Sequence, residues 1–192
     1  MNLELETMAI AMPEVEGHPN RIGFHGLLTL VDVPSDRAPN GARGHRVLLP
    51  RKLAEQAIPS LLGMALDYAP TWDRHDVRRK VGVITSAEVV GNGLEVGGYL
   101  FAKVFPEIVE EVARSGKRPG RNARERSSSS QELGMSYEVT SVGILNRQEP
   151  VWVLTSATFT GAAILRRQKA AYRKTWIELE EQQGNTECEG RL

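Results

Sequence analysis

A strand, a tight turn and a returning strand follow one another between residues 81 and 101, and this pattern constrains the fold more than any other feature. Val81–Val90 is largely apolar and rich in β-branched residues, as strands are. The next three residues, Gly91-Asn92-Gly93, are a strong tight-turn signal, and residues 94–101 alternate as a returning strand does. The segment predicts a β-hairpin in the middle of the chain.

Three other segments have strand composition. Residues 22–33 are β-rich and end at turn residues, residues 47–49 suit a short strand, and residues 133–142 alternate. We therefore expect strands both before and after the central hairpin in the sequence.

Three segments are expected to be helical. Pro50 fits the first turn of a helix that runs to about Ile58, and residues 105–113 have apolar side chains at helical spacing with acids near the start. Residues 168–183 have roughly helical spacing too, which predicts a helix that either docks on the core or binds a partner.

Length and composition favour one domain. A chain of 192 residues with 41% hydrophobic and 25% charged residues can bury one sizeable core, which we place at residues 21–183. An arm is expected at 1–20, a mobile basic and serine-rich loop at 114–131, and a disordered tail at 184–192.

Charge and cysteine content exclude several classes of protein. Lys and Arg equal Asp and Glu in number, so we expect no nucleic-acid partner, although loop 114–131 could contact phosphate or an acidic partner. Cys188 is the only cysteine, which excludes an internal disulfide framework and a cysteine-rich zinc site. The first residues lack a basic signal region, and no apolar run approaches the roughly 20 residues that span a bilayer, so we expect no membrane partner.

His75 is the candidate general base. It stands between Asp73 and Asp76, just before the strand that begins near Val81, and a carboxylate beside a histidine can orient the ring and keep it basic. The alternative is a surface histidine on a polar loop. The other three histidines are interpreted as structural: His18, His25 and His45.

Ser136 is the candidate nucleophile. It lies on the alternating segment 133–142, two residues after Gly134, where a strand can fix the direction of its hydroxyl. The four serines at 127–130 lie in a polar tract that offers no such fixing. The alternative is a serine on the polar face of a strand.

Three segments resemble the capsid maturation (prohead) proteases of tailed bacteriophages: Trp72–Thr85, Leu133–Glu138 and Leu154–Leu165. The resemblance runs from about Ile22 to Tyr172. These enzymes are related in fold to the herpesvirus maturation protease, assemblin, a serine protease whose histidine precedes its serine, as His75 precedes Ser136 here. The resemblance implies that His75 is the base and Ser136 the nucleophile, and that backbone N–H groups near Leu165–Arg167 hold the oxyanion.

The third catalytic group departs from the herpesvirus pattern, in which it is a second histidine. No histidine follows His75 in this chain, and Thr158 stands at the matching place, where it cannot hold charge on an imidazolium as a carboxylate would. Four carboxylates remain open as substitutes: Asp73, Asp76, Glu138 and Glu149.

The resemblance also implies a fold and a function. We expect an α+β fold with a largely antiparallel barrel or curled sheet and surrounding helices. The function implied is a serine endopeptidase that cleaves scaffold protein, the N-terminal segment of the major capsid protein and itself, inside the procapsid in the bacterial cytoplasm. No cofactor or metal is expected, and a homo-oligomer is expected because assemblin relatives dimerise. The alternative is an inactive protease-fold protein that acts in capsid assembly.

Overall fold

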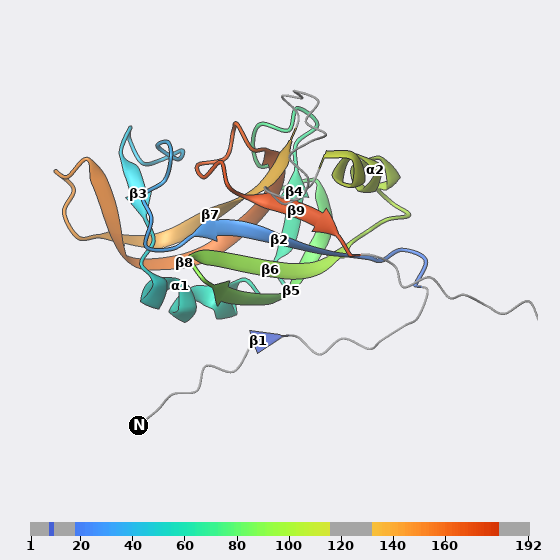
Figure 1. Ribbon diagram of the computed structural model, residues 1–192, viewed down its shortest axis with the longest axis horizontal. Coiled ribbons are helices and arrows are strands. Elements are labelled where there is room, and N and C mark those ends of the chain that lie inside the picture. Colours follow the sequence, from blue (N-terminus) through green and yellow to red (C-terminus); the bar gives the residue numbers. More distant parts are fainter. Residues whose placement is uncertain (1–7, 10–17, 116–131, 181–192) are drawn as a thin grey trace, which may run out of the picture.

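The computed structural model describes residues 8–9, 18–115 and 132–180. Most of the predicted loop 114–131 and all of the predicted tail 184–192 therefore lie outside the described residues. In the described part, nine strands form one sheet, and two α-helices and a short 3-10 helix pack outside it (Figure 1). The strands are β1 (Met8–Ala9), β2 (Ile22–Leu30), β3 (Arg46–Leu48), β4 (Ala65–Tyr68), β5 (Lys80–Val90), β6 (Gly93–Leu100), β7 (Leu133–Ile144), β8 (Val151–Arg166) and β9 (Trp176–Leu179).

The sheet is organised around β8, which has 16 residues and pairs with three strands. It pairs in parallel with β3 near its start and with β4 near its end, and it pairs antiparallel with β7 along most of its length. From β4 the sheet continues through β5, β6 and β2 to β9 in antiparallel order.

The sheet curls until its far edge meets β7. Gly26 of β2 is so close to β7 and β9 that a Cβ at this position would lie 2.6 Å from Met135 Sδ and 2.6 Å from the Trp176 carbonyl oxygen. The interior is filled by apolar side chains from most strands and from both helices, among them Phe24, Leu66, Ile84, Leu100, Ile108 and Met135. The expected α+β fold with a curled, largely antiparallel sheet is confirmed (Figure 1).

Most of the elements expected from sequence are present. The central hairpin is β5 and β6, with Val90 opposite Gly93. Helix α1 (Arg51–Ala57) follows Pro50 and passes into the 3-10 helix η1 (Ile58–Ser60), and α2 (Pro106–Ser115) lies beside β9. No helix in the described segments is long and apolar enough to cross a membrane.

The predicted helix at 168–183 is wrong over its described part. Residues 176–179 form β9, which pairs with residues 24–27 of β2 and buries Trp176 and Ile177. The edge of β2 would otherwise expose unpaired backbone groups, and pairing it outweighs the weak helical preference of this short segment.

Candidate active site

Three neighbouring strands place two of the site residues in one row. Asp67 of β4 is opposite Ala163 of β8, and Ala163 is opposite Ser136 of β7. Residues opposite one another in a sheet point to the same face, and residues two apart on a strand share that face. Asp67, Ser136 and Glu138 therefore share a face, and the flanking residue Met135 points into the main core instead.

The loop between β4 and β5 carries His75 over this face. It is fixed to β8 where the Arg166 N–H donates to the Trp72 carbonyl at 2.9 Å, and to β4 where the Asp76 N–H donates to Asp67 Oδ1 at 3.2 Å. Trp72 also packs on Tyr68 with ring centroids 5.2 Å apart. These contacts hold the His75 side chain in a largely buried position, with 13% of its surface exposed.

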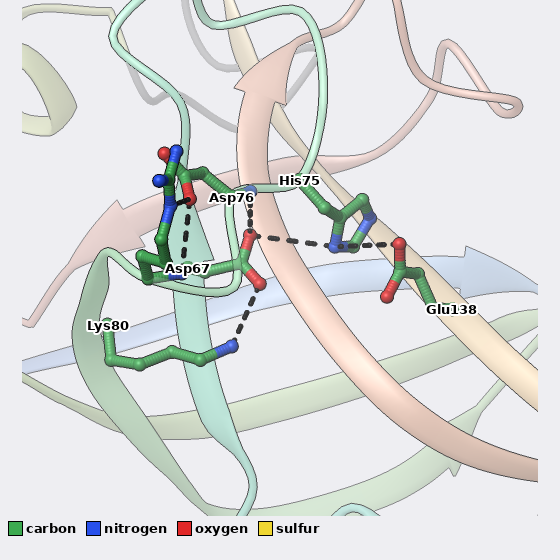
Figure 2. A network of polar contacts seen from close by, with 6 residues as sticks. Asp67, His75, Asp76, Lys80 and Glu138 are labelled. Carbon is green, nitrogen blue, oxygen red and sulfur yellow. Dashed lines mark hydrogen bonds and ion pairs between the residues drawn. The ribbon is translucent and has the colours of Figure 1, made fainter.

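His75 lies between two carboxylates (Figure 2). Its Nδ1 is 3.5 Å from Asp67 Oδ1 and 3.9 Å from Glu138 Oε1. These are ion-pair distances, and neither ring nitrogen makes a hydrogen bond within the described residues. Because Nδ1 faces both carboxylates, we assign the ring proton to Nδ1, which leaves Nε2 as the basic nitrogen.

Asp67 is a fully buried carboxylate with fixed partners. Besides the Asp76 N–H, it accepts a hydrogen bond from Lys80 Nζ at 3.1 Å. Burial raises the pKa of Asp67, but the contacts with His75 and Lys80 outweigh it and hold the pKa below the ordinary value. Asp67 is therefore charged at neutral pH.

Sequence reasoning missed Asp67 because it lies inside the apolar run 61–68. A carboxylate in such a run is costly to bury unless it is paired, and this cost was the signal that could have identified it.

Of the four carboxylates left open by the sequence, only Glu138 approaches His75. Asp76 makes ion pairs at 3.5 Å with Arg78 and with Arg79, and Asp73 accepts a hydrogen bond from the Thr71 hydroxyl. Hydrogen bonds from the Arg78 N–H and the Thr71 hydroxyl are the largest influences on the pKa values of Asp76 and Asp73 respectively, and both pKa values are lowered.

Glu149 and Thr158 lie elsewhere. The Glu149 carbonyl contacts His45 Nδ1 at 2.9 Å, and Thr158 is exposed opposite Thr140, five residues along β8 from Ala163. At about 3.3 Å per strand residue, Thr158 lies roughly 16 Å from Ala163 along the strand.

A cavity of about 900 Å³ joins His75 and Ser136. Both residues line it together with Glu138. Its other end is apolar and is lined by Val47, Val139, Ile144, Trp152 and Leu154. No hydrogen bond joins His75 and Ser136 in the described structure, so the two residues share a cavity without direct contact.

The backbone N–H groups expected to hold an oxyanion are already engaged. The Arg166 N–H donates to the Trp72 carbonyl at 2.9 Å, and the Arg167 N–H donates to the Glu132 carbonyl at 2.8 Å. They could serve an oxyanion only after releasing these carbonyls, so this part of the sequence prediction differs from the structure.

The remaining histidines have structural partners. His25 Nε2 lies 2.7 Å from Glu178 Oε1, His45 stacks on Trp152 at 4.4 Å, and His18 Nδ1 accepts the Asn20 N–H at 3.1 Å. Within the described ranges, no group of three or more acidic, histidine or cysteine side chains is placed to hold a metal ion.

The chain was compared with known proteins. No family model matches it, and no curated relative was found. Among solved structures it is similar to the KSHV protease in complex with a hexapeptide phosphonate inhibitor, with a TM-score of 0.44 and 11% identity over 84% of this chain and 66% of that chain. The chain thus spans just under two thirds of the length of that protein's chain. A likeness of this degree assigns neither a family nor an activity.

Proposed function

We propose that this protein is a serine endopeptidase in which His75 is the base and Ser136 the nucleophile. The observation that carries the proposal is the shared row of Asp67, Ala163 and Ser136, with His75 above it and beside the buried Asp67 carboxylate. Ser136 and His75 line the same cavity, which has room for a peptide.

The reaction proposed is acyl transfer. Nε2 of His75 takes the proton of the Ser136 hydroxyl, Oγ attacks the scissile carbonyl carbon, and His75 returns the proton to the leaving amine. Water then enters, loses a proton to His75 and attacks the acyl carbon, and His75 returns that proton to Ser136 Oγ as the peptide acid leaves. Asp67 keeps Nδ1 protonated and stabilises the imidazolium, the role that the resemblance left without a residue.

Direct contact between Ser136 and His75 would form when substrate binds. Catalytic hydrogen bonds are often long or absent in apo structures and shorten in the substrate complex. Because His75 lies on the loop 69–79, a local rearrangement of this loop would bring the two side chains together.

The substrates proposed are scaffold protein, the N-terminal segment of the major capsid protein and the protease itself. The support is the resemblance of segments 72–85, 133–138 and 154–165 to prohead proteases. Cleavage would take place inside the assembling procapsid in the bacterial cytoplasm, by a homo-oligomer. A slow enzyme suffices there, because substrate concentration inside a shell is high.

The second candidate is a capsid assembly protein without activity. It is favoured by one observation: the His75 ring makes no hydrogen bond with Ser136 or with any other described residue. A fold that suits a protease does not require that the chemistry is kept.

The test is co-expression with candidate scaffold and capsid proteins, followed by intact-mass spectrometry of every product. Wild type is compared with Ser136→Ala and His75→Ala, and Ser141→Ala on the same strand is the matched control. The protease proposal predicts discrete truncations that both site substitutions abolish and the control retains. Full-length partners in all samples, with shells still assembling, would favour the assembly protein.

A further inference from the structure

A second depression, of about 470 Å³, lies beside the cavity of the candidate site. Four of the six residues that line it are cations: Arg37, Arg167, Lys169 and Arg173. The other two are Glu132 and Gln168. We call this feature the basic depression.

Among the described residues, Glu132 is the only carboxylate that lines the basic depression, and a neighbouring cation pairs with it. Glu132 Oε2 accepts a hydrogen bond from Arg167 Nη1 at 2.5 Å, and Arg167 Nε also donates to the Thr175 carbonyl at 2.7 Å. The other three cations are left without a paired carboxylate in the lining of the depression.

Those three cations are exposed, and none of them makes an ion pair or hydrogen bond with a carboxylate among the described residues, although the charge of Lys169 acts on the Asp73 carboxylate. The only side-chain hydrogen bond of Arg37 is to the Gln168 carbonyl at 2.7 Å, and the side chains of Lys169 and Arg173 make no hydrogen bond or ion pair in the described chain. The nearby Asp36 carboxylate accepts the Arg173 backbone N–H at 2.7 Å and lies outside the lining. Like charges so close together are held at a cost, which an anionic ligand would relieve.

Two loops build the basic depression and hold it in shape. The Asp36 N–H donates to the Ala171 carbonyl at 2.9 Å, and the Asp36 carboxylate and the Arg37 guanidinium also bind the segment 168–173. The buried Tyr172 hydroxyl donates to the Val33 and Val47 carbonyls, which fixes the same segment to the sheet. The cations therefore stand on a preorganised backbone.

The basic depression is continuous with the cavity of the candidate site. Arg37 and Lys169 line both hollows, and Asp73, on whose pKa the charge of Lys169 acts, lines the cavity of the candidate site. A peptide chain that lies across Ser136 can therefore place residues outside the scissile region against these cations.

We propose that the basic depression is a docking site for an acidic stretch of the protein substrate, separate from the residues that bind the scissile bond. That the ligand is a substrate rests on the proposed function, whereas the anion-binding site itself rests on the charges and contacts described above. An acidic segment would add affinity and orient the polypeptide along the cavity through charge complementarity.

The test is direct binding by full-length Ser136→Ala, which cannot cleave its ligand through Ser136. Fluorescein-labelled hexaglutamate and hexaglutamine peptides are titrated at low salt, and binding is followed by fluorescence anisotropy. We expect hexaglutamate to bind, hexaglutamine not to bind, and the affinity for hexaglutamate to fall several-fold when ionic strength rises from about 0.05 M to about 0.5 M.

The variant to compare is Lys169→Glu/Arg173→Glu, because neither side chain supports the described fold. Its matched control is Lys52→Glu/Lys103→Glu, which makes the same change in net charge at two exposed cations away from the depression. We expect about a tenfold loss of hexaglutamate affinity in the first variant and less than about a twofold change in the control, as for a few exposed ion pairs. Arg37→Gln is a milder third variant, expected to weaken binding about threefold.

Three results would overturn the proposal: no binding of hexaglutamate, equal losses in the two charge-reversed variants, or binding kept by both. The last would assign the peptide to another basic segment, such as residues 116–131. Failure of the docking site is distinguishable from failure of the proposed function, because reaction of Ser136 with a serine-directed probe needs no acidic peptide.

Discussion

Asp67 has no exposed surface, and its carboxylate contacts three partners: His75, Lys80 and the Asp76 backbone N–H. Glu138 reaches the same His75 nitrogen from a side chain that is 48% exposed. A carboxylate with fixed partners in a buried site orients a histidine more firmly than one that is half in water. We therefore assign the orienting role to Asp67.

This assignment predicts different effects for the two carboxylates. Asp67→Asn should slow covalent labelling of Ser136 by a fluorophosphonate by about 10²- to 10⁴-fold, because the ring tautomer is no longer fixed. Glu138→Gln should slow it by less than about tenfold. Labelling rates from intact-mass spectrometry measure both, and a larger effect at Glu138 would contradict the assignment.

The lowered pKa of Asp67 predicts a pH dependence of stability. The folded pKa lies below the unfolded value of about 3.9, so the contribution of Asp67 is complete above that value and is lost as pH falls through the folded pKa. Asp67→Asn should cost about 1–3 kcal/mol of unfolding free energy at neutral pH. Its deficit relative to wild type should shrink as the solution is acidified below about pH 4.

Thermal unfolding of both proteins between about pH 3 and pH 7 measures this dependence. Glu110→Gln is the control, because Glu110 is exposed on α2 and makes no ion pair in the described structure. A deficit in Asp67→Asn that stays constant down to the lowest pH would show that its charge does not stabilise the fold.

Single residues show what the sequence could predict of the site. His75 was identified from the carboxylates beside it in sequence, yet the buried carboxylate nearest to its ring is Asp67, which lies in strand β4 eight positions earlier. Only the pairing of β4 with β8 brings Asp67 and Ser136 into one row. Strand order and register are non-local, so a local pattern can propose His75 and Ser136 but cannot choose their partner.

At the scale of elements, the segments with strong local signals were predicted, whereas β4, β8 and β9 were not predicted as strands. The hairpin of β5 and β6 has a turn signal and two strand patterns that agree with the fold. Residues 176–179 have no turn signal and no clear strand pattern of their own. They form a strand because the edge of β2 would otherwise be unpaired. The secondary structure of residues 176–179 therefore depends on which strand edge the rest of the sheet leaves unpaired.

The close approach of β2, β7 and β9 predicts the effect of adding one methyl group. In Gly26→Ala the new Cβ would lie 2.6 Å from the Trp176 carbonyl oxygen, a backbone atom that cannot move without displacing β9. We expect a loss of about 1–3 kcal/mol in unfolding free energy.

Gly97→Ala is the matched control for this substitution. Its Cβ would meet the Ser86 hydroxyl at 2.7 Å, and that side chain can rotate away. Urea unfolding of both variants measures the difference. Equal losses would show that β9 does not pack on β2 as closely as described.

At the scale of the whole molecule, the curled sheet brings two hollows of different character together. One joins His75 and Ser136 to an apolar end, and the other is lined mainly by cations. Net charge is zero over the chain, so the basic depression is a local concentration of charge that composition could not reveal. Composition led us to expect one sizeable core, because that expectation depends only on how much apolar surface the chain can bury.

Reaction of the folded protein with a fluorophosphonate, followed by peptide mapping, shows whether Ser136 is a nucleophile that depends on His75. We expect one adduct, on Ser136, which is lost in Ser136→Ala, strongly slowed in His75→Ala and kept in Ser141→Ala. No adduct on Ser136, or an adduct whose rate does not depend on His75, would contradict the claim that these two residues form a nucleophile and its base.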